Sequence, residues 1–327
     1  MRHLFIINPV AGQGEKQVPV LLERITAAFP QGDCEVHITA GPGDAAKWTA
    51  EAARTGEPAR VYACGGDGTL NEVGAAAAGR PQLAVTNVPM GSGNDFLRMF
   101  GEGRSRFTDL AALRDGPQSP IDLMECNGKL CLDVFCVGVD ARVAHDVGRY
   151  KTYPLLSGTL AYVAALAVNV LFKGITRPMS VDMGDVHWRG ETTLVCVCNG
   201  RHYGGGFMPV AEAQPDDGIL DALLVPKATR TTFLRLVGKY AKGRYRACGG
   251  LIQDYHGDRI VISSDRELIA VADGETLRSS RFEIGLSPLK LNVFYPRGAF
   301  WRESSQTANN LDSPNFENER FRKKTGV

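Results

Sequence analysis

Several common functional signatures are missing from this chain of 327 residues. Its formal net charge is only +1, so no basic excess points to nucleic acid as a partner. None of the eight cysteines belongs to the paired CxxC knuckles that hold structural zinc. Residues Met1 to Asn8 have the pattern of a core strand and lack the charged-then-apolar pattern of an export signal. We therefore expect a cytoplasmic protein with reduced cysteines.

The chain also lacks an uninterrupted apolar run of the length that a membrane span needs. The nearest approach is Leu155 to Phe172, which is largely apolar but is broken by small and polar residues. These are Ser157, Gly158, Thr159, Tyr162 and Asn169. We interpret the segment as a buried or interfacial helix, and a spanning helix is the alternative.

The two commonest nucleotide-binding loops are absent as well. The first glycine-rich loop, Asn8 to Gly14, is followed by Lys16 but by no GKS or GKT, so it is not a Walker A loop. It does not match the GxGxxG dinucleotide fingerprint either. If this chain binds a nucleotide, it must use a less common loop.

A second glycine-rich turn, GGDGT, is present at residues 65–69. It stands between a short apolar strand, Arg60–Cys64, and a predicted helix, Leu70–Ala78. Glycines let the backbone come close to a ligand, and the N-terminus of the following helix favours a phosphate. Asp67, within the turn, would repel a phosphate unless a cation stood between them. The pattern predicts a metal–nucleotide site, and an ordinary glycine-rich connection is the alternative.

Strands and helices alternate through the first 120 residues. The predicted strands are His3–Asn8, Cys34–Thr39, Arg60–Cys64 and Leu83–Asn87, and the predicted helices are Val18–Phe29, Asp44–Arg54 and Leu70–Ala78. This alternation predicts a parallel sheet with helices on both faces, whose ligands bind at the carboxyl ends of the strands. Three loops leave those ends and should meet in one crevice: residues 8–14, the GGDGT turn, and residues 89–95.

From Ile121 onward the pattern becomes a series of strands joined by turns. The predicted strands are Ile121–Cys126, Leu130–Val137, Met179–Met183, Thr192–Cys198, Ile219–Val225, Arg259–Ser263, Glu267–Ala272, Arg281–Leu286 and Leu289–Phe294. Such a series is typical of antiparallel β structure, and we expect a sandwich interrupted by helices near Tyr153–Phe172 and Thr231–Lys242. The predicted domains are 1–120 (α/β) and 121–300 (β), with a last strand that can return to the first domain. Residues 303–327 are polar and predict a disordered tail.

The third loop, PMGSGNDF at residues 89–96, resembles the second in design. Glycines bracket a hydroxyl, that of Ser92, and Asp95 stands just before a short apolar helix. The alternative role is local, because Asn94 or Asp95 could cap the start of that helix. The two roles are compatible.

Taken together, NPVAGQG, GGDGTLNEV and PMGSGNDF resemble the diacylglycerol-kinase catalytic superfamily, and within it the soluble bacterial lipid kinases. The resemblance covers residues 4 to 296. Later segments match in the same order: Ile121-Asp122-Leu123 with Asn127-Gly128, residues 215–221 (PDDGILD), and residues 272–275 (ADGE). It implies an N-terminal α/β nucleotide domain like that of NAD kinases and phosphofructokinases, a C-terminal β-sandwich, and ATP in the cleft between them.

The resemblance also implies roles for particular residues. Nucleotide contacts are implied for Asn8, Thr39, Gly65, Gly66, Asp67, Gly68, Thr69, Leu70, Asn71, Glu72, Gly91, Ser92 and Asn94. A catalytic Mg²⁺ network is implied for Asp67, Asp95 and Asp122, and a structural Mg²⁺ site for Gln214, Asp217 and Ile219. Glu275 would be the general base on the lipid hydroxyl, with Asp67 as the second catalytic residue. For the segment around Asp217 a tight Asp-Gly turn is the alternative.

One predicted helix has the composition of a membrane-surface element. From Ala222 to Gln253 there is no Asp or Glu, and Arg235, Lys239 and Lys242 share one helical face while apolar residues share the other. A basic amphipathic helix is attracted to anionic lipid, so we expect peripheral association with the inner face of the membrane. The alternative is a surface helix that packs its apolar face on the β domain.

These observations predict a kinase of a lipid hydroxyl that depends on ATP and Mg²⁺, with diacylglycerol as the first candidate acceptor and phosphatidic acid as its product. Sphingoid bases, ceramide and phosphatidylglycerol are alternative lipids. An NAD-kinase-like enzyme and a non-enzymatic nucleotide- or lipid-binding regulator are the alternatives of other kinds. The oligomeric state stays open, and a homodimer is compatible with the sequence.

Overall fold

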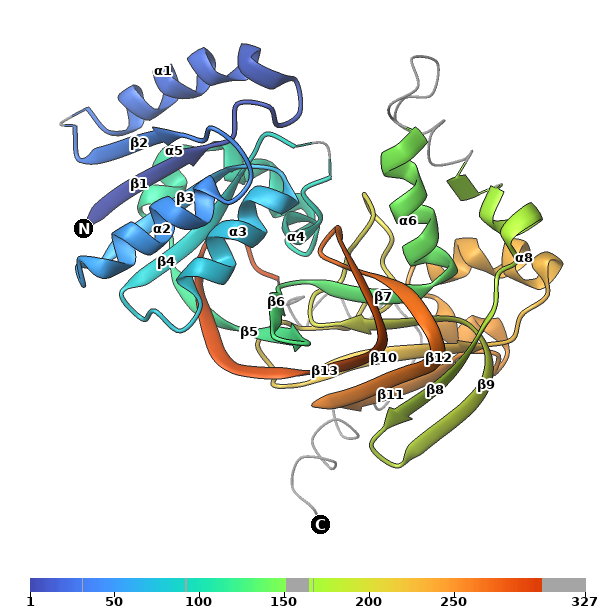
Figure 1. Ribbon diagram of the computed structural model, residues 1–327. Helices are drawn as coiled ribbons and strands as arrows, with labels where there is room; N and C mark the ends of the chain where they lie inside the picture. Colours follow the sequence, from blue (N-terminus) through green and yellow to red (C-terminus); the bar gives the residue numbers. More distant parts are fainter. Residues whose placement is uncertain (31, 92, 151–164, 167, 302–327) are drawn as a thin grey trace.

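In the computed structural model the chain folds into two lobes that share one hydrogen-bonded network of strands (Figure 1). The structure describes residues 1–30, 32–91, 93–150, 165–166 and 168–301, and within them thirteen strands belong to this network. The predicted tail at 303–327, most of the helix predicted near Tyr153–Phe172, and Ser92 lie outside the described residues.

The first lobe is a parallel sheet with helices on both faces, as predicted. Its strands are β1 (Arg2–Ile7), β2 (Cys34–Ile38), β3 (Ala59–Gly65) and β4 (Leu83–Pro89), in the spatial order β4-β3-β1-β2. Its helices are η1 (Gly14–Gln17), α1 (Val18–Ala28), α2 (Asp44–Arg54), α3 (Asp67–Ala77), α4 (Asp95–Arg98), η2 (Gly101–Thr108) and α5 (Leu110–Arg114). Strands β1, β3 and β4 are buried along most of their length because their side chains are apolar on both faces, whereas the edge strand β2 is partly exposed.

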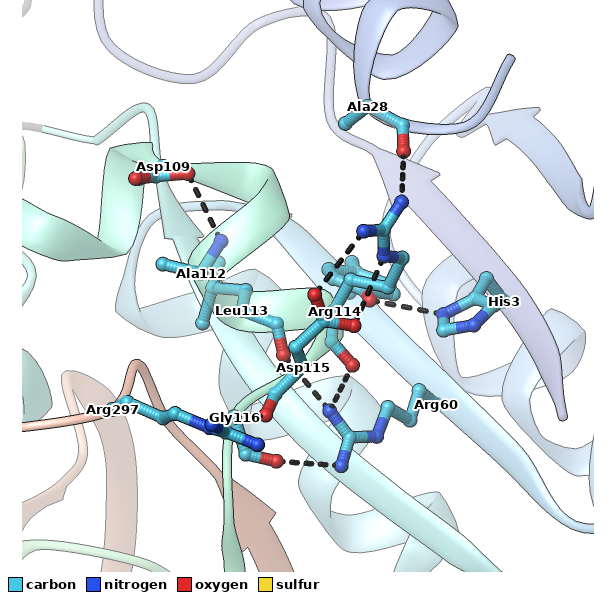
Figure 2. A network of polar contacts seen from close by, with 11 residues as sticks. His3, Ala28, Arg60, Asp109, Ala112, Leu113, Arg114, Asp115, Gly116 and Arg297 are labelled. Carbon is cyan, nitrogen blue, oxygen red and sulfur yellow. Dashed lines mark hydrogen bonds and ion pairs between the residues drawn. The ribbon is translucent and has the colours of Figure 1, made fainter.

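At the start of β3, away from the glycine turn, the first lobe is held by an arginine network (Figure 2). The Arg60 guanidinium donates hydrogen bonds to the carbonyl oxygens of Leu113, Arg114 and Gly116 at 2.7–2.8 Å. Arg114 in turn donates to the carbonyl oxygen of Ala28 at 2.7 Å. These cations satisfy carbonyl groups that the ends of α5 and α1 leave without helical partners.

The second lobe is antiparallel, also as predicted. Its strands are β5 (Gln118–Cys126), β6 (Lys129–Cys131), β7 (Val134–Gly138), β8 (Arg177–Met183), β9 (Val186–Cys198), β10 (Leu220–Pro226), β11 (Gln253–Gly257), β12 (Arg259–Ala272) and β13 (Glu275–Phe294). The helices α6 (Val139–Tyr150), η3 (Asn169–Lys173), α8 (Arg230–Tyr240) and η4 (Tyr245–Cys248) accompany them. Side chains alternate along the strands between the interior of the sandwich and a second apolar cluster beneath the helices.

Several boundaries in this lobe differ from the sequence prediction. The segment Leu130–Val137 is not one strand, because Leu132 and Asp133 separate β6 from β7. The four predicted strands between Arg259 and Phe294 are only two, β12 and β13, each continued through an irregularity in its pairing. Neither α6 nor β11 was predicted. Helix α6 follows β7 directly at Gly138, whose positive φ of 123° turns the chain without a recognisable loop.

Two strands connect the lobes. Ile121 of β5 lies in the core of the first lobe, whereas Met124 of the same strand lies in the core of the second. β13 pairs with β5 for most of this passage and reaches β4 through Val293 and Val85. In Figure 1 the orange strand β13 bends upward from the second lobe to the first. The last strand therefore returns to the first lobe.

Candidate active site

The glycine turn after β3 is built for close backbone approach. Gly66 is extended (φ −98°, ψ −165°) and precedes α3, which begins at Asp67 rather than at the predicted Leu70. A Cβ on Gly91 would lie 2.5 Å from the Cα of Gly66, and one on Gly65 would lie 2.3 Å from the hydroxyl oxygen of Thr69. Only glycine fits these positions, so the second and third loops press together by their backbones.

The first loop closes against the same place. The amide of Asn8 donates to the Thr69 hydroxyl at 3.0 Å, and its carbonyl oxygen accepts from the backbone of Val10 at 3.1 Å. A Cβ on Gly12 would collide with the carbonyl oxygen of Met90. The three loops therefore meet at the carboxyl ends of the strands, as predicted.

These loops form one wall of a cleft of about 1280 Å³ that is partly open to solvent. Of the residues with implied nucleotide contacts, those that line the cleft are Asn8, Thr39, Gly66, Asp67, Gly68, Thr69, Glu72 and Gly91. Leu70 and Asn71 are instead buried in α3, and Gly65 is the buried end of β3. The amide of Asn94 donates to the carbonyl oxygen of Gly91 at 2.7 Å, so this residue stabilises the third loop and is not part of the cleft lining.

Two aspartates meet where the second and third loops touch. The carboxylate of Asp67 accepts a 2.6 Å hydrogen bond from the backbone of Asp95, and Asp67 lines the cleft. Asp95 is almost buried: one oxygen pairs with Arg98 at 2.9 Å, and the other accepts from Gly205 of the second lobe at 2.7 Å. Burial, followed by the charge of Asp67, raises the pKa of Asp95. Asp95 thus joins the lobes, while Asp67 faces the cleft.

Asp122 does not join these two aspartates in the wall of the cleft. Its buried carboxylate pairs with Lys290 and accepts a 2.7 Å hydrogen bond from the backbone of Gly218. Its own backbone donates to Pro215 at 2.6 Å. Asp122 therefore holds the 215–218 loop, where Asp217 also accepts from the backbone of Ile219 at 3.0 Å. The local geometry of this loop is that of a tight turn, with Gly218 at φ +72°.

The second lobe supplies the opposite wall through the turn between β12 and β13. Asp273, Gly274 and Glu275 line the cleft together with Asp67. Asp273 has a left-handed backbone (φ 45°), and its carboxylate accepts hydrogen bonds from the backbone N–H groups of residues 132–134 at 2.5–3.1 Å. This anchor fixes the turn, and half-exposed Glu275 pairs with Lys129 at 3.2 Å.

Asp133 is a buried acid that sequence reasoning missed. Its side chain is 6% exposed, and one carboxylate oxygen takes no hydrogen bond within the described part of the chain. Burial, together with the charges of Asp273, Asp95 and Asp67, raises the pKa of Asp133 well above its usual range. No motif in the sequence marked this position, because its surroundings come from distant segments.

A second, apolar pocket lies in the second lobe beneath α8. It is narrow: its cavity volume is only about 50 Å³, although about 600 Å³ lies between its walls when open solvent is included. The walls include Val143, Leu194, Phe207, Phe233, Leu236 and Leu251. A polar group stands within it: the Tyr203 hydroxyl donates to Asp140 at 3.0 Å and lies 3.3 Å from the Tyr240 hydroxyl. Burial raises the pKa of Asp140 to about 6. Tyr203 is two residues from Gly205, so the loop that lines this pocket also holds Asp95.

The pocket explains the amphipathic pattern of α8. Phe233, Leu236 and Val237 face the pocket, which corresponds to the packing alternative for the apolar side of this helix. Arg235, Lys239 and Lys242 are exposed. Within the described residues no helix is both long enough and apolar enough to cross a membrane.

A glycine-lined cleft that carries acidic side chains and takes one wall from each of two lobes is the kind of site in which phosphotransferases bind a nucleotide. Comparison with protein families agrees. Residues 2–126 match the diacylglycerol kinase catalytic domain, and residues 133–295 match the YegS C-terminal NAD kinase beta sandwich-like domain.

Two relatives carry the name "Probable lipid kinase YegS-like". That of Pseudomonas aeruginosa PAO1 is 30% identical over 297 residues, which are 88% of this chain and 92% of the relative. That of Pseudomonas putida KT2440 is 30% identical over 81% of this chain and 86% of the relative. A crystal structure of a diacylglycerol kinase from Bacillus anthracis has the same fold, with a TM-score of 0.65 and 23% identity over 91% of this chain and 98% of that one. The chain belongs to the YegS-like lipid kinase family, and it is a phosphotransferase with an alcohol group as acceptor.

Proposed function

We propose that this lipid kinase transfers the γ-phosphoryl group of ATP, in the presence of Mg²⁺, to the free hydroxyl of diacylglycerol and so forms phosphatidic acid. The observation that carries the proposal is that Asp67 of the first lobe and Glu275 of the second line the same cleft. The remaining steps assign the nucleotide, the metal, the base and the lipid to parts of that cleft and of the neighbouring pocket.

The cradle formed by Gly66, Gly68 and Gly91 suits a triphosphate. At Gly91 there is no space for a side chain, nothing lies within 4 Å of a Cβ built on Gly68, and the cradle opens at the N-terminus of α3, whose first N–H groups have no helical partners. In this proposal Asn8, Thr39 and Glu72 contact the rest of the nucleotide, as they line the same wall.

The residues present also fit a magnesium ion that arrives with the nucleotide. The described residues contain no cluster of three or more acidic, histidine or cysteine side chains arranged to hold a metal by themselves. Mg²⁺ in nucleotide sites is commonly held by one or two carboxylates together with phosphate oxygens and waters. Asp67 would supply such a carboxylate, with Asp95 directly behind it, and the ion would neutralise charge on the phosphates. Gln214, Asp217 and Ile219 remain a proposed structural Mg²⁺ site.

Glu275 is placed to act as the general base. Its carboxylate would accept the proton of the lipid hydroxyl as the hydroxyl oxygen bonds to the γ-phosphorus and the bond from that phosphorus to the ADP oxygen breaks. The Asp273 anchor keeps Glu275 facing the first lobe. Lys129 pairs with this carboxylate at 3.2 Å.

The apolar pocket beneath α8, which is narrow as it stands, would widen to take the hydrocarbon chains of the lipid. Its apolar lining offsets the cost of removing acyl chains from a bilayer, and Asp140 with Tyr203 offers hydrogen bonds to a polar head. Because the loop that carries Tyr203 also reaches Asp95 through Gly205, the head would lie toward the phosphate cleft.

A substrate panel tests this function. Purified protein with radiolabelled ATP and Mg²⁺ is given diacylglycerol, ceramide, sphingosine, phosphatidylglycerol and NAD in parallel, and each reaction is repeated with EDTA. We expect label in phosphatidic acid, and none in the EDTA arm. Label in another lipid would redirect the acceptor assignment, and equal labelling with EDTA would reject the magnesium requirement.

A further inference from the structure

Two large apolar side chains on neighbouring elements of the second lobe are exposed. Phe172 of η3 is 80% exposed, and Leu234 of α8 is 53% exposed. The two elements touch, because Arg230 of α8 donates a 2.6 Å hydrogen bond to the carbonyl oxygen of Val170 in η3. Leu234 stands one helical turn beyond Arg230. Exposed apolar side chains of this size on touching elements indicate a surface that binds an apolar partner.

The charge around these side chains selects the kind of partner. Residues 222–252 contain no Asp or Glu. The exposed cations of this stretch are Lys227, Arg230, Arg235, Lys239, Lys242, Arg244 and Arg246, of which Arg246 pairs with Glu212. Cations that surround exposed apolar tips complement the anionic headgroups and the hydrocarbon of a bilayer, which offers both over a whole surface.

The same surface borders the apolar pocket. Phe233, which precedes Leu234, lines the pocket from α8, and Leu166, which precedes η3, lines it as well. Phe172 and Leu234 themselves are not part of the pocket lining. The exposed pair is therefore carried by elements that also contribute to, or directly follow, the lining of the pocket.

We infer that Phe172 and Leu234 form an apolar wedge that enters an anionic bilayer, with the cations of residues 227–244 on the headgroups, so that the pocket takes its lipid directly from the membrane. This inference rests on the proposed lipid-binding role of the pocket. It assigns the wedge to the outward side of α8 and η3, whereas the apolar side of α8 is occupied by the pocket.

Vesicle binding tests the wedge. The double variant Phe172→Ser/Leu234→Ser is compared with the unmodified protein in sedimentation with vesicles of phosphatidylcholine and phosphatidylglycerol. We expect about tenfold or greater weakening of partitioning, since two large apolar groups no longer enter the bilayer. The control is Val20→Ser/Phe300→Ser, which removes side chains that are 57% and 65% exposed in the first lobe. The control should bind like the unmodified protein.

The salt dependence of vesicle binding distinguishes the contribution of the wedge from that of the cations. At about 0.5 M NaCl the headgroup attraction is largely screened, so the unmodified protein should keep part of its binding while the double serine variant loses nearly all of it. Arg235→Gln/Lys239→Gln should show the opposite pattern, with weak binding at low salt and little further loss. A double serine variant that binds like the unmodified protein at both salt concentrations would overturn the inference.

Activity on a dispersed substrate keeps this inference distinct from the proposed function. With a short-chain diacylglycerol below its micelle concentration, the double serine variant should turn over at the unmodified rate, because neither residue lines the pocket or the cleft. If the unmodified protein phosphorylates no lipid, the proposed acceptor fails although the vesicle result stands. If light scattering shows a dimer that the serine changes dissociate, the surface covers a second copy of the chain and the wedge is wrong.

Discussion

At the scale of single residues, the candidate active site contains acidic side chains that the fold places in different surroundings. Asp67 faces the cleft, Asp95 is held between Arg98 and the second lobe, and Glu275 reaches in from the opposite wall. Asp133 is buried, and burial raises its pKa well above the usual range. Environment, more than residue type, decides which of these acids can accept a proton or meet a metal-bound phosphate.

Replacing Glu275 by Gln should keep the shape of the side chain and remove the base. We expect turnover to fall about 10²–10⁴-fold, the usual contribution of a general base, while ATP binding stays within a factor of about two. Steady-state kinetics with diacylglycerol and calorimetry with ATP check this. Glu267→Gln is the matched control, because Glu267 is also an exposed acid paired with a cation, Arg278. Unchanged turnover in the Glu275 variant would reject its role.

Replacing Asp67 by Asn should preserve the acceptor for the backbone N–H of Asp95 but remove a charge from the cleft. We expect activity to fall at least about 10²-fold, because the magnesium ion proposed to neutralise the phosphates loses its carboxylate ligand. The loss should appear as a higher Mg²⁺ requirement in a titration at fixed ATP. Asp33→Asn changes an exposed acid beyond the opposite end of the sheet and should be neutral. Normal magnesium dependence in the Asp67 variant would argue against this assignment.

At the scale of elements, buried cations and ion pairs hold helices and strands in register. In the first lobe Arg60 joins β3 to the end of α5 (Figure 2). Its guanidinium also lies 4.7 Å from the centre of the ring of Phe294 in β13. In the second lobe His256 of β11 sits between Asp221 of β10, at 2.5 Å, and Asp254, at 3.4 Å. Each device connects elements that are distant in sequence or lie at the edge of the sheet.

Arg60→Met should retain the aliphatic stem and lose the three hydrogen bonds to carbonyl groups. We expect about 2–4 kcal/mol less free energy of unfolding, since charge-assisted hydrogen bonds to buried carbonyls are lost together. Urea denaturation measures it. Arg54→Met removes an arginine whose side chain is 76% exposed and should change the value by less than about 0.5 kcal/mol. Equal effects of the two changes would contradict a structural role for the network.

The His256 pair should make stability depend on pH in the alkaline range. Hydrogen bonds to Asp221 and then Asp254 raise the pKa of His256 to about 9. A group whose pKa is raised by folding stabilises fully below its unfolded value, about 6.5, and this contribution disappears as pH rises through about 9. We expect about 1–3 kcal/mol to be lost between pH 6 and pH 9.5 in urea denaturation. His256→Gln should flatten that dependence, and an unchanged slope in this variant would show that other groups cause it.

At the scale of the whole molecule, the active site is a property of the contact between lobes. β5 and β13 pass from one core to the other, and β13 carries Glu275 at one end and pairs with β4 near the other. The Asp273 turn and the Gly205 contact to Asp95 then position the second lobe over the glycine loops. The proposed wedge and the apolar pocket both lie on the second lobe, so the proposal places membrane contact apart from the glycine loops of the first lobe.

The sequence allowed the glycine loops to be predicted well, because a strand, a glycine turn and a helix start within about ten residues are governed by local backbone preferences. It did not allow the partners of Asp122 to be foreseen, since Lys290 and Gly218 come from remote segments. The contact between Asp273 and the segment around Asp133 was not predicted either, because these residues are also distant in sequence. Helix α6 was missed because Gly138 turns the strand directly into it.

The most direct test of the account is a crystal structure with a non-hydrolysable ATP analogue, Mg²⁺ and a short-chain diacylglycerol. We expect the terminal phosphate to lie against the backbone N–H groups of residues 66–68, with the ion beside Asp67. The free hydroxyl of the lipid should lie within hydrogen-bond distance of Glu275. A terminal phosphate bound away from Gly66, or a Glu275 that turns away from the phosphate when both ligands are present, would contradict the account.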